Sequence, residues 1–203
     1  MIQIKVEGLT KKYDKNVIFE DFTTTLDSDS YVFLKGENGS GKTTFINCLL
    51  SLVSYEGVIE KEGLVFSYTP EKISLPDYMS VSNFLYLIAL NRGKMPSEIK
   101  EEVKTYLEKF SILEYEKTMF CKLSKGTKQK VLLIQNLMSK SDVYIFDEPL
   151  SGLDEESRRV FIGELKQLKK ADKLIIISTH HIDEYNYKKK KIINFPQGVV
   201  LTC

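Results

Sequence analysis

The feature that most constrains this chain is residues 36–44, with the sequence Gly-Glu-Asn-Gly-Ser-Gly-Lys-Thr-Thr. This stretch follows an apolar, strand-like run, Tyr31–Leu34, and precedes the helical apolar spacing that begins at Phe45. Glycines in such a turn let successive backbone N–H groups point at one anion, and the following helix adds the partial positive charge of its N-terminus. Strand, glycine-rich turn and helix in this order predict a phosphate-binding P-loop, and therefore a site for a nucleoside triphosphate.

Lys42 and Thr43 supply the chemistry that a glycine turn lacks. Lys42 brings a full positive charge for the β and γ phosphates, and the hydroxyl of Thr43 is placed to ligate Mg²⁺. The residues expected to contact the nucleotide are Gly36, Asn38, Gly39, Ser40, Gly41, Lys42, Thr43 and Thr44. The alternative is a glycine-rich turn that merely starts a helix, which the lysine, the hydroxyl and both flanking elements disfavour.

Length, charge and cysteine content narrow the class of protein. A chain of 203 residues fits one domain, or one large domain with a subdomain. The formal net charge of +1 gives no reason to expect nucleic acid as a partner. Cys48, Cys121 and Cys203 are far apart and lack metal-like spacing, so we expect reduced thiols in a cytosolic protein. No signal-peptide core is found, and the longest uncharged stretch, residues 78–91, is too short and too polar to span a bilayer.

The order of strand-like and helical patterns predicts an α/β core interrupted by a helical insertion. Strands are expected at residues 2–6, 17–26, 57–59, 64–68, 143–146, 174–177, 191–195 and 199–201. The first two should pair antiparallel, and the last two should flank a turn at residues 196–198. Helical spacing extends from about Ser80 to Met138, with a helix start near Pro96, and returns over Glu155–Lys170.

Two adjacent acids follow the apolar strand at residues 143–146. Asp147 ends the strand, where a carboxylate is well placed to hold Mg²⁺. Glu148 can accept a proton from the water that attacks the γ-phosphate, or orient that water. Such a pair is common after an apolar strand, but roughly a hundred residues downstream of a P-loop it is a strong signal.

A second candidate anion site lies at residues 123–130. Ser124 is a predicted helix N-cap, Gly126 follows it, and the helix N-terminus would attract an anion. In isolation a plain capped helix is the favoured alternative. A monomer with one triphosphate in its P-loop has no obvious use for a second phosphate site, whereas two chains arranged head to tail would use both.

The motifs in this order resemble those of the ATP-binding cassette (ABC) ATPases, over essentially the whole chain. They are the P-loop, Leu123-Ser124-x-Gly126, Asp147-Glu148-Pro149, Ser151-Gly152-Leu153-Asp154 and Ser178-Thr179-His180. The resemblance implies a P-loop NTPase (RecA-like) core with an N-terminal antiparallel β subdomain and a helical insertion subdomain. Residues 1–203 would form a single ABC ATPase domain, in which the helical subdomain occupies approximately residues 76–140 and contains the signature motif.

The resemblance also implies roles for individual residues and the cofactors ATP and Mg²⁺. Tyr13, an ordinary turn tyrosine on local sequence alone, would stack on the base. Ser124 and Gly126 would clasp the γ-phosphate bound to the opposite subunit. The catalytic residues would be the base Glu148, the switch residue His180 and Lys42, the Mg²⁺ ligands would be Thr43, Asp147 and Glu71, and Asp154 would link the two sites across the dimer.

Three positions depart from the family pattern. Glu71 stands where a glutamine is usual, and a glutamate can still ligate Mg²⁺ but adds negative charge near the phosphates. In the signature, Lys125 replaces a glycine and Thr127 replaces a glutamine, while Ser124 and Gly126 remain. His181 beside His180 could suggest a metal pair, but neighbouring residues in an extended segment point apart, so no metal is expected there.

We therefore expect the ATP-hydrolysing subunit of an ABC transporter. The small size of the chain and the variant at residues 68–71 favour an exporter type. The subunit would dimerise with a second ATP-binding subunit and power a separately encoded transmembrane permease. Its location would be cytoplasmic, peripheral on the inner face of the membrane. The alternative is a soluble ABC ATPase acting on ribosomes or nucleic acid, against which the single cassette and the lack of a basic footprint argue. A P-loop kinase would leave the segments at Ser124–Gly126 and Asp154 unexplained.

Overall fold

The computed structural model describes residues 1–14, 16–196 and 199–202, and the chain divides into two compact units. The sheet unit comprises Met1–Tyr68, Ser141–Glu148 and the chain from Leu168 onward, and the helical unit comprises Thr69–Lys140 and Pro149–Gln167. The helical unit thus contains Pro149–Gln167 in addition to the insertion inferred from sequence. Lys15 in the first predicted turn, Gln197 and Gly198 in the last predicted turn, and Cys203 lie outside the described residues.

The first sheet of the sheet unit is antiparallel. Among the described residues it has three strands in the order β2-β1-β4, with bounds β1 Gln3–Tyr13, β2 Asn16–Asp27 and β4 Glu56–Glu60. The predicted antiparallel pairing of the first two strands is confirmed, with Ile4 opposite Leu26. Side chains alternate at the start of β1, so that Ile4 and Val6 are fully buried, as expected for a sheet with one face on the core. A shift of register between Val6 and Leu9 interrupts this alternation, and Leu9 is also fully buried. The strand is longer than predicted, so Tyr13 is its last residue and does not lie in the turn.

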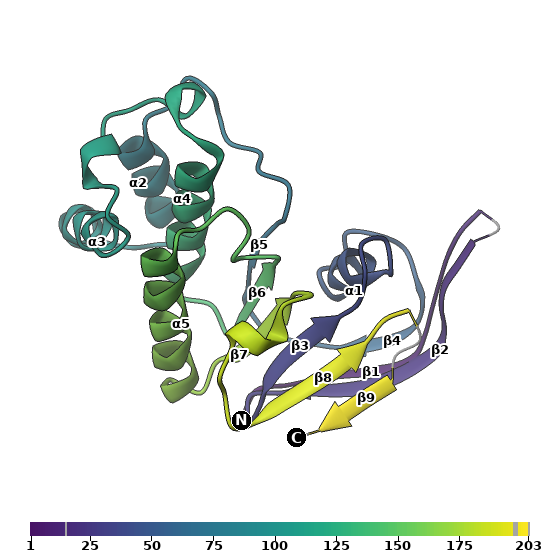
Figure 1. Ribbon diagram of the computed structural model, residues 1–203. Coiled ribbons are helices and arrows are strands. Elements are labelled where there is room, and N and C mark those ends of the chain that lie inside the picture. Colours follow the sequence, from purple (N-terminus) through teal and green to yellow (C-terminus); the bar gives the residue numbers. More distant parts are fainter. Residues whose placement is uncertain (15, 197–198, 203) are drawn as a thin grey trace. The chain divides into compact units, whose positions relative to one another are not determined.

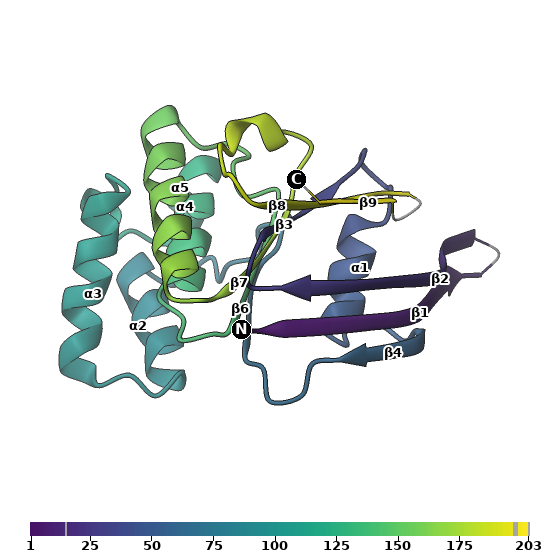
Figure 2. The same cartoon turned by 90° about the horizontal axis from the view of Figure 1, so that it is seen from below.

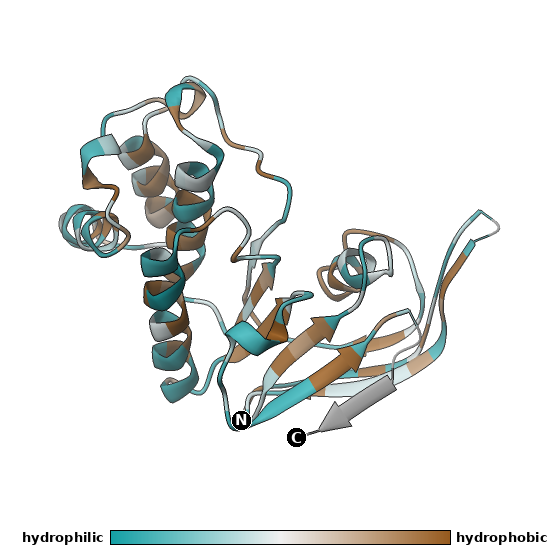
Figure 3. Ribbon diagram, in the orientation of Figure 1, coloured by the Kyte–Doolittle hydropathy of each residue, from teal (hydrophilic) through white to brown (hydrophobic). Residues whose placement is uncertain are grey.

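The second sheet carries the P-loop strand. In the described part of the chain it has six strands in the order β5-β6-β7-β3-β8-β9. Their bounds are β3 Tyr31–Lys35, β5 Phe66–Thr69, β6 Val143–Asp147, β7 Leu174–Ser178, β8 Lys190–Asn194 and β9 Val199–Thr202. Strands β6, β7, β3 and β8 run parallel, and β9 returns antiparallel to β8. The continuous apolar runs in β6 and β7 predict strands that are buried on both faces. Both strands are buried at every position (brown in Figure 3).

One core joins both sheets and the helix after the P-loop, α1 (Lys42–Leu49). Val6 from the antiparallel sheet, Leu34 and Ile176 from the parallel sheet, and Phe45 and Ile46 from α1 belong to the same buried cluster. Figure 2 shows α1 beside both sheets. This packing fixes α1 at the carboxyl end of β3. The carboxyl ends of β3, β6 and β7 meet at the same edge because the three strands are parallel, and this edge is where α/β sheets bind ligands.

The helical unit consists mainly of α-helices (Figure 1), formed by segments in which the sequence predicts helical apolar spacing. It contains α2 (Val81–Asn91), α3 (Pro96–Lys109), α4 (Lys125–Leu137) and most of α5 (Glu155–Lys170). Short 3-10 turns lie at Leu113–Tyr115 and Phe120–Lys122, and a further one lies at Ile182–Glu184 in the sheet unit. Helix α3 begins at its proline, where the missing N–H costs nothing.

The α/β class predicted from the sequence is confirmed. Among the described residues, no helix combines the length and the apolar character needed to cross a membrane.

Candidate functional site

The P-loop occupies the turn between β3 and α1. Gly41 is the N-cap of α1 in a left-handed conformation with φ 106°, which glycine adopts without strain. A Cβ at Gly41 would lie 2.8 Å from Ile18 Cγ2, so glycine is also required by the close approach of β2. The first turn of α1 has no acidic residue, and Gly41 provides no side-chain cap. The backbone N–H groups at this helix start therefore face a site suited to an anion.

Lys42 is the first residue of α1 and is only 6% exposed. Its ammonium donates hydrogen bonds to the Gly36 and Glu37 carbonyls, at 2.7 and 2.9 Å. These bonds hold the side chain back along the loop. Because the ammonium is a compact charge with three donors, phosphate oxygens placed in the loop are stronger acceptors for it than neutral carbonyls.

Thr43 and Asp147 meet across the sequence. Thr43 Oγ1 donates to Asp147 Oδ2 at 2.8 Å, which joins the start of α1 to the end of β6. Asp147 is 1% exposed, and its Oδ1 is buried without a hydrogen-bond partner among the described residues. An unpaired buried carboxylate oxygen beside a hydroxyl is the donor set that Mg²⁺ prefers. Tyr68, to which the sequence analysis gave no role at the metal site, places its hydroxyl 3.5 Å from Asp147 Oδ2.

Glu148 and His180 are paired by the sheet register. Asp147 lies opposite Ser178, so the residues that follow these two strand ends are brought together. The Glu148 N–H donates to the Ser178 carbonyl at 2.9 Å, and Glu148 Oε1 lies 3.0 Å from His180 Nδ1. Glu148 has a φ of 47°, a left-handed conformation that is uncommon for a glutamate and is typical of functional sites. Its side chain is 10% exposed, so bulk water has little access to it, as suits a base that acts on a single attacking water.

The two histidines lie against each other. The ring centroids of His180 and His181 are 3.8 Å apart, with an angle of 48° between the planes. The expectation that they point apart is therefore wrong. The segment is not extended, because β7 ends at Ser178 and a 3-10 turn begins at Ile182. Within residues 1–14, 16–196 and 199–202, no three His, Cys, Asp or Glu side chains gather as a metal site would require.

Tyr13 is an exposed ring at the end of β1. It is 44% exposed, and the Lys11 ammonium lies 4.3 Å from its centroid. A ring with this exposure is available for stacking, and the nearby cation suits an anionic ligand.

In the helical unit, Ser124 caps α4. Its Oγ accepts the Thr127 N–H at 3.1 Å and lies 2.9 Å from Thr127 Oγ1. Thr127, one of the departures from the family pattern, thus bonds the N-cap hydroxyl directly. Gly126 packs against the chain that precedes α5, since a Cβ there would lie 2.7 Å from the Gly152 carbonyl oxygen.

Two buried polar residues of α4 support this contact. Gln129 Nε2 donates to the Pro149 carbonyl at 3.2 Å, and Lys130 Nζ pairs with Asp154 Oδ2 at 2.7 Å. The sequence analysis gave neither residue a role. The spacing in the sequence could have indicated such a role. Gly126, Gln129 and Lys130 stand at i, i+3 and i+4, and residues at this spacing share one face of a helix.

Replacing Gly126 by Ala should therefore separate α4 from the Gly152 backbone. The new Cβ meets a carbonyl that cannot rotate away, so we expect a cost of about 1–3 kcal/mol in the free energy of unfolding. Urea unfolding measures this. Gly163→Ala is the matched control, since a Cβ on this α5 glycine would meet nothing within 4 Å. Equal stability of the Gly126 and Gly163 variants would contradict the close packing.

The Lys130–Asp154 pair predicts a pH dependence. The Lys130 ammonium and, after it, the Ser157 N–H hold the pKa of Asp154 well below its ordinary value. A carboxyl with a lowered folded-state pKa stabilises the fold above its unfolded pKa, near 3.9, and loses that contribution as the pH falls toward the folded value. The Asp154 side chain is 56% exposed, so solvent screening reduces the contribution to about 0.5–1 kcal/mol.

Asp154→Asn should therefore lower stability at pH 7 and lower it less at pH 2, as measured by urea unfolding at both values. Glu156→Gln, which removes a neighbouring exposed carboxylate, is the control. An equal loss at both pH values would show that the charge of Asp154 is not responsible.

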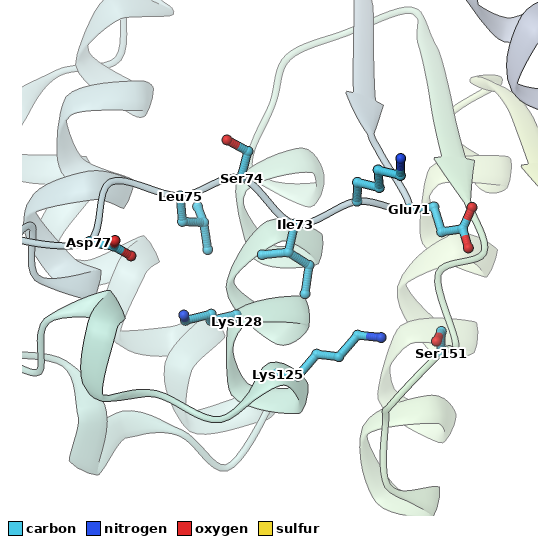
Figure 4. Close-up of a pocket in the computed structure, with 9 residues that line it drawn as sticks. Glu71, Ile73, Ser74, Leu75, Asp77, Lys125, Lys128 and Ser151 are labelled. Atoms are coloured by element: carbon cyan, nitrogen blue, oxygen red, sulfur yellow. The ribbon is translucent and has the colours of Figure 1, made fainter.

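A cavity of about 710 Å³ lies within the helical unit. Figure 4 shows Lys125 and Lys128 on α4 facing the chain that runs from Glu71 to Asp77, with Ser151 at one end. The helical unit therefore contains Glu71, Ser124 and Gly126, whereas the sheet unit brings together the P-loop, Asp147, Glu148 and His180.

A glycine-rich phosphate loop with a buried lysine, a hydroxyl paired to a strand-end carboxylate and an adjacent glutamate define a P-loop nucleoside triphosphatase. The comparisons with known proteins identify the family. The ABC transporter family profile matches residues 19–151. An ABC transporter ATP-binding protein of Methanocaldococcus jannaschii is 30% identical over 197 residues, covering 97% of this chain and 75% of the relative. One from Bacillus subtilis is 35% identical over 153 residues, covering 75% and 65%.

Solved structures agree with this assignment. The ATP-binding subunit of an ABC transporter superposes with a TM-score of 0.88 at 26% identity, covering 98% of this chain and 89% of its own. A dimeric ATP-binding cassette in a post-hydrolysis state, bound to ADP and phosphate, has a TM-score of 0.86 over 98% of each chain, and at 18% identity it supports the fold alone. The chain belongs to the ABC transporter family, and it is an ATP-binding subunit and ATPase of that family.

Proposed function

We propose that this chain is the ATP-hydrolysing subunit of an exporter-type ABC transporter, and that it works as a head-to-tail dimer on a separately encoded membrane permease. The proposal rests on two pairs of side chains that lie at the same edge of the parallel sheet. Thr43 bonds Asp147 where a metal would sit, and Glu148 beside them is held by His180. This arrangement provides phosphate binding, a metal ligand set and a base in one unit.

Binding begins at the P-loop. The phosphate oxygens accept hydrogen bonds from the N–H groups at the start of α1. The Lys42 ammonium leaves the two loop carbonyls that it now bonds and donates to phosphate oxygens instead. When bound, Mg²⁺ offsets the charge of the phosphate oxygens. Thr43 and Asp147 would hold it through the hydroxyl and the unpaired Oδ1, and we assign Glu71 as a further ligand. Tyr13 stacks on the base.

Hydrolysis then depends on Glu148. Its carboxylate orients the attacking water and accepts its proton as the water oxygen bonds to the γ-phosphorus. The bond from that phosphorus to the bridging oxygen breaks, and ADP and phosphate are released. His180 Nδ1 lies 3.0 Å from Glu148 Oε1, and we assign this imidazole two roles: it would orient the carboxylate and contact the γ-phosphate. Burial of Glu148 keeps the proton transfer away from bulk water.

We assign Ser124 and Gly126 to the γ-phosphate bound by the second copy. The start of α4 offers N–H groups and a capping hydroxyl, and its first turn has no acidic residue. ATP would thus join two chains, hydrolysis would release them, and Asp154 would link the two sites.

The permease would dock on exposed apolar residues of the helical unit. Tyr78 is 86% exposed, Leu87 45% and Met119 43%, and they border a hollow of about 500 Å³. Exposed apolar side chains grouped in this way mark interaction sites. The permease would hold the subunit on the inner face of the membrane.

Complementation between two defective chains tests the dimer. Lys42→Ala removes the P-loop charge, and Ser124→Arg blocks the signature, so each chain alone should be inactive. In a head-to-tail heterodimer both defects can fall in one site, which leaves the other intact. Mixing the two variants should restore ATP hydrolysis at one site, and wild-type specific activity should rise with protein concentration. Activity that is independent of concentration and not restored by mixing would refute the composite site.

A further inference from the structure

Two departures from the family pattern line the same cavity and carry opposite charges. Glu71 stands where a neutral glutamine is usual, and Lys125 where a glycine is usual. They are separated by more than fifty residues in sequence, yet both line the 710 Å³ cavity of the helical unit. The two changes together leave the formal charge of the cavity as the usual residues would.

Three further charged residues line the cavity, namely Lys72, Asp77 and Lys128. The charged residues that Figure 4 labels lie at two ends of it. The Lys125 ammonium is directed toward the end that carries Glu71 and Ser151, and the Lys128 ammonium toward the end that carries Asp77. Among the described residues, neither Glu71 nor Lys125 has an ion-pair partner within 4.0 Å. The two residues do not form an ion pair with each other either, so an interaction between them would act across the cavity.

We propose that Lys125 is a positioning residue for Glu71, and that it compensates the negative charge which Glu71 brings to the bound Mg²⁺–triphosphate. This inference rests on the proposed function, because it takes Glu71 as a ligand of the metal in that site. A triphosphate is highly anionic, so an added carboxylate opposes its binding. A lysine across the same cavity reduces that opposition and draws the carboxylate away from the phosphates.

The size of the effect follows from Coulomb's law in a partly solvated cavity. We take an effective dielectric constant between that of a protein surface and that of water. Two unit charges several ångströms apart in such a medium change a binding constant by roughly 3- to 10-fold. Such an interaction is screened by salt, since the Debye length falls from about 10 Å at 0.1 M to about 3 Å at 1 M. A purely structural role of Lys125 at the start of α4 would not depend on salt in this way.

The test is a double-mutant cycle on nucleotide binding. Glu71→Gln, Lys125→Gln and the double variant are compared by titration with a fluorescent ATP analogue and Mg²⁺, at 0.1 M and 1 M salt. Lys125→Gln should weaken binding by roughly 3- to 10-fold while Glu71 is present, and by less than about 2-fold in the Glu71→Gln background. The coupling should be largely lost at 1 M salt.

Lys128→Gln is the matched control. It removes the same charge from the same helix and the same cavity, at the end away from Glu71. Lys128→Gln should change the affinity for the nucleotide by the same factor whether residue 71 is Glu or Gln. Thermal unfolding of each variant verifies that the chain remains folded.

The outcomes separate this inference from the proposed function. If wild type binds and hydrolyses ATP but Lys125→Gln has equal effects in both backgrounds, the compensation is refuted and the proposed function stands. If wild type binds ATP without hydrolysing it, the proposed function fails. The double-mutant cycle on binding then still tests whether Lys125 and Glu71 are coupled. If wild type does not bind Mg²⁺–ATP, both fail.

Discussion

Replacing Glu148 by Gln is expected to slow ATP hydrolysis by roughly 10²–10⁴-fold, because the variant lacks the general base. The amide has nearly the same shape as the carboxylate but cannot accept the proton. The P-loop, Lys42 and the Thr43–Asp147 pair do not depend on Glu148 Oε1, so ATP binding should persist. A chain that binds ATP and cannot hydrolyse it should accumulate as an ATP-bound dimer, measurable by size-exclusion chromatography.

The control for this variant is Glu184→Gln in the nearby 3-10 turn, where a carboxylate is also lost. That variant should hydrolyse ATP like wild type. If Glu148→Gln hydrolysed at the wild-type rate, Glu148 would not be the base. If it bound ATP without dimerising, the partner would be a different cassette.

Replacing Lys42 by Ala is expected to weaken ATP binding by roughly 100-fold, because a charge-assisted contact with two phosphates is lost. The substitution also leaves the Gly36 and Glu37 carbonyls without the ammonium that now satisfies them. Equilibrium titration with a fluorescent ATP analogue measures the loss. Thermal unfolding of the unliganded variant shows whether the loop still folds.

Lys35→Ala is the matched control for this second variant. Lys35 is an exposed lysine at the end of β3, immediately before the loop, and it carries the same charge. Its removal should change ATP affinity by less than about 2-fold, as expected for an exposed charge. Equal losses for Lys35 and Lys42 would mean that general electrostatic attraction, and not a specific contact, binds the nucleotide.

Local chemistry made much of the fold and site predictable from the sequence. The P-loop depends on nine consecutive residues whose backbone and side-chain roles are set by their immediate neighbours. The buried strands β6 and β7 and the start of α3 at Pro96 follow from apolar runs and from the geometry of proline. Two expectations based on local geometry failed. Tyr13 was expected in a turn but is the last residue of β1, and the expectation for His180 and His181 assumed an extended backbone where the chain turns.

The tertiary structure alone decided which distant residues meet. The pairing of Glu148 with His180 depends on the register of β6 against β7, and the approach of Gly126 to Gly152 depends on how α4 packs. By itself the sequence determined the phosphate chemistry of this protein, because that chemistry is built from neighbours in the chain. Sheet register and helix packing placed Glu71 and Lys125 in one cavity, because contacts between distant segments arise from burial of the whole core.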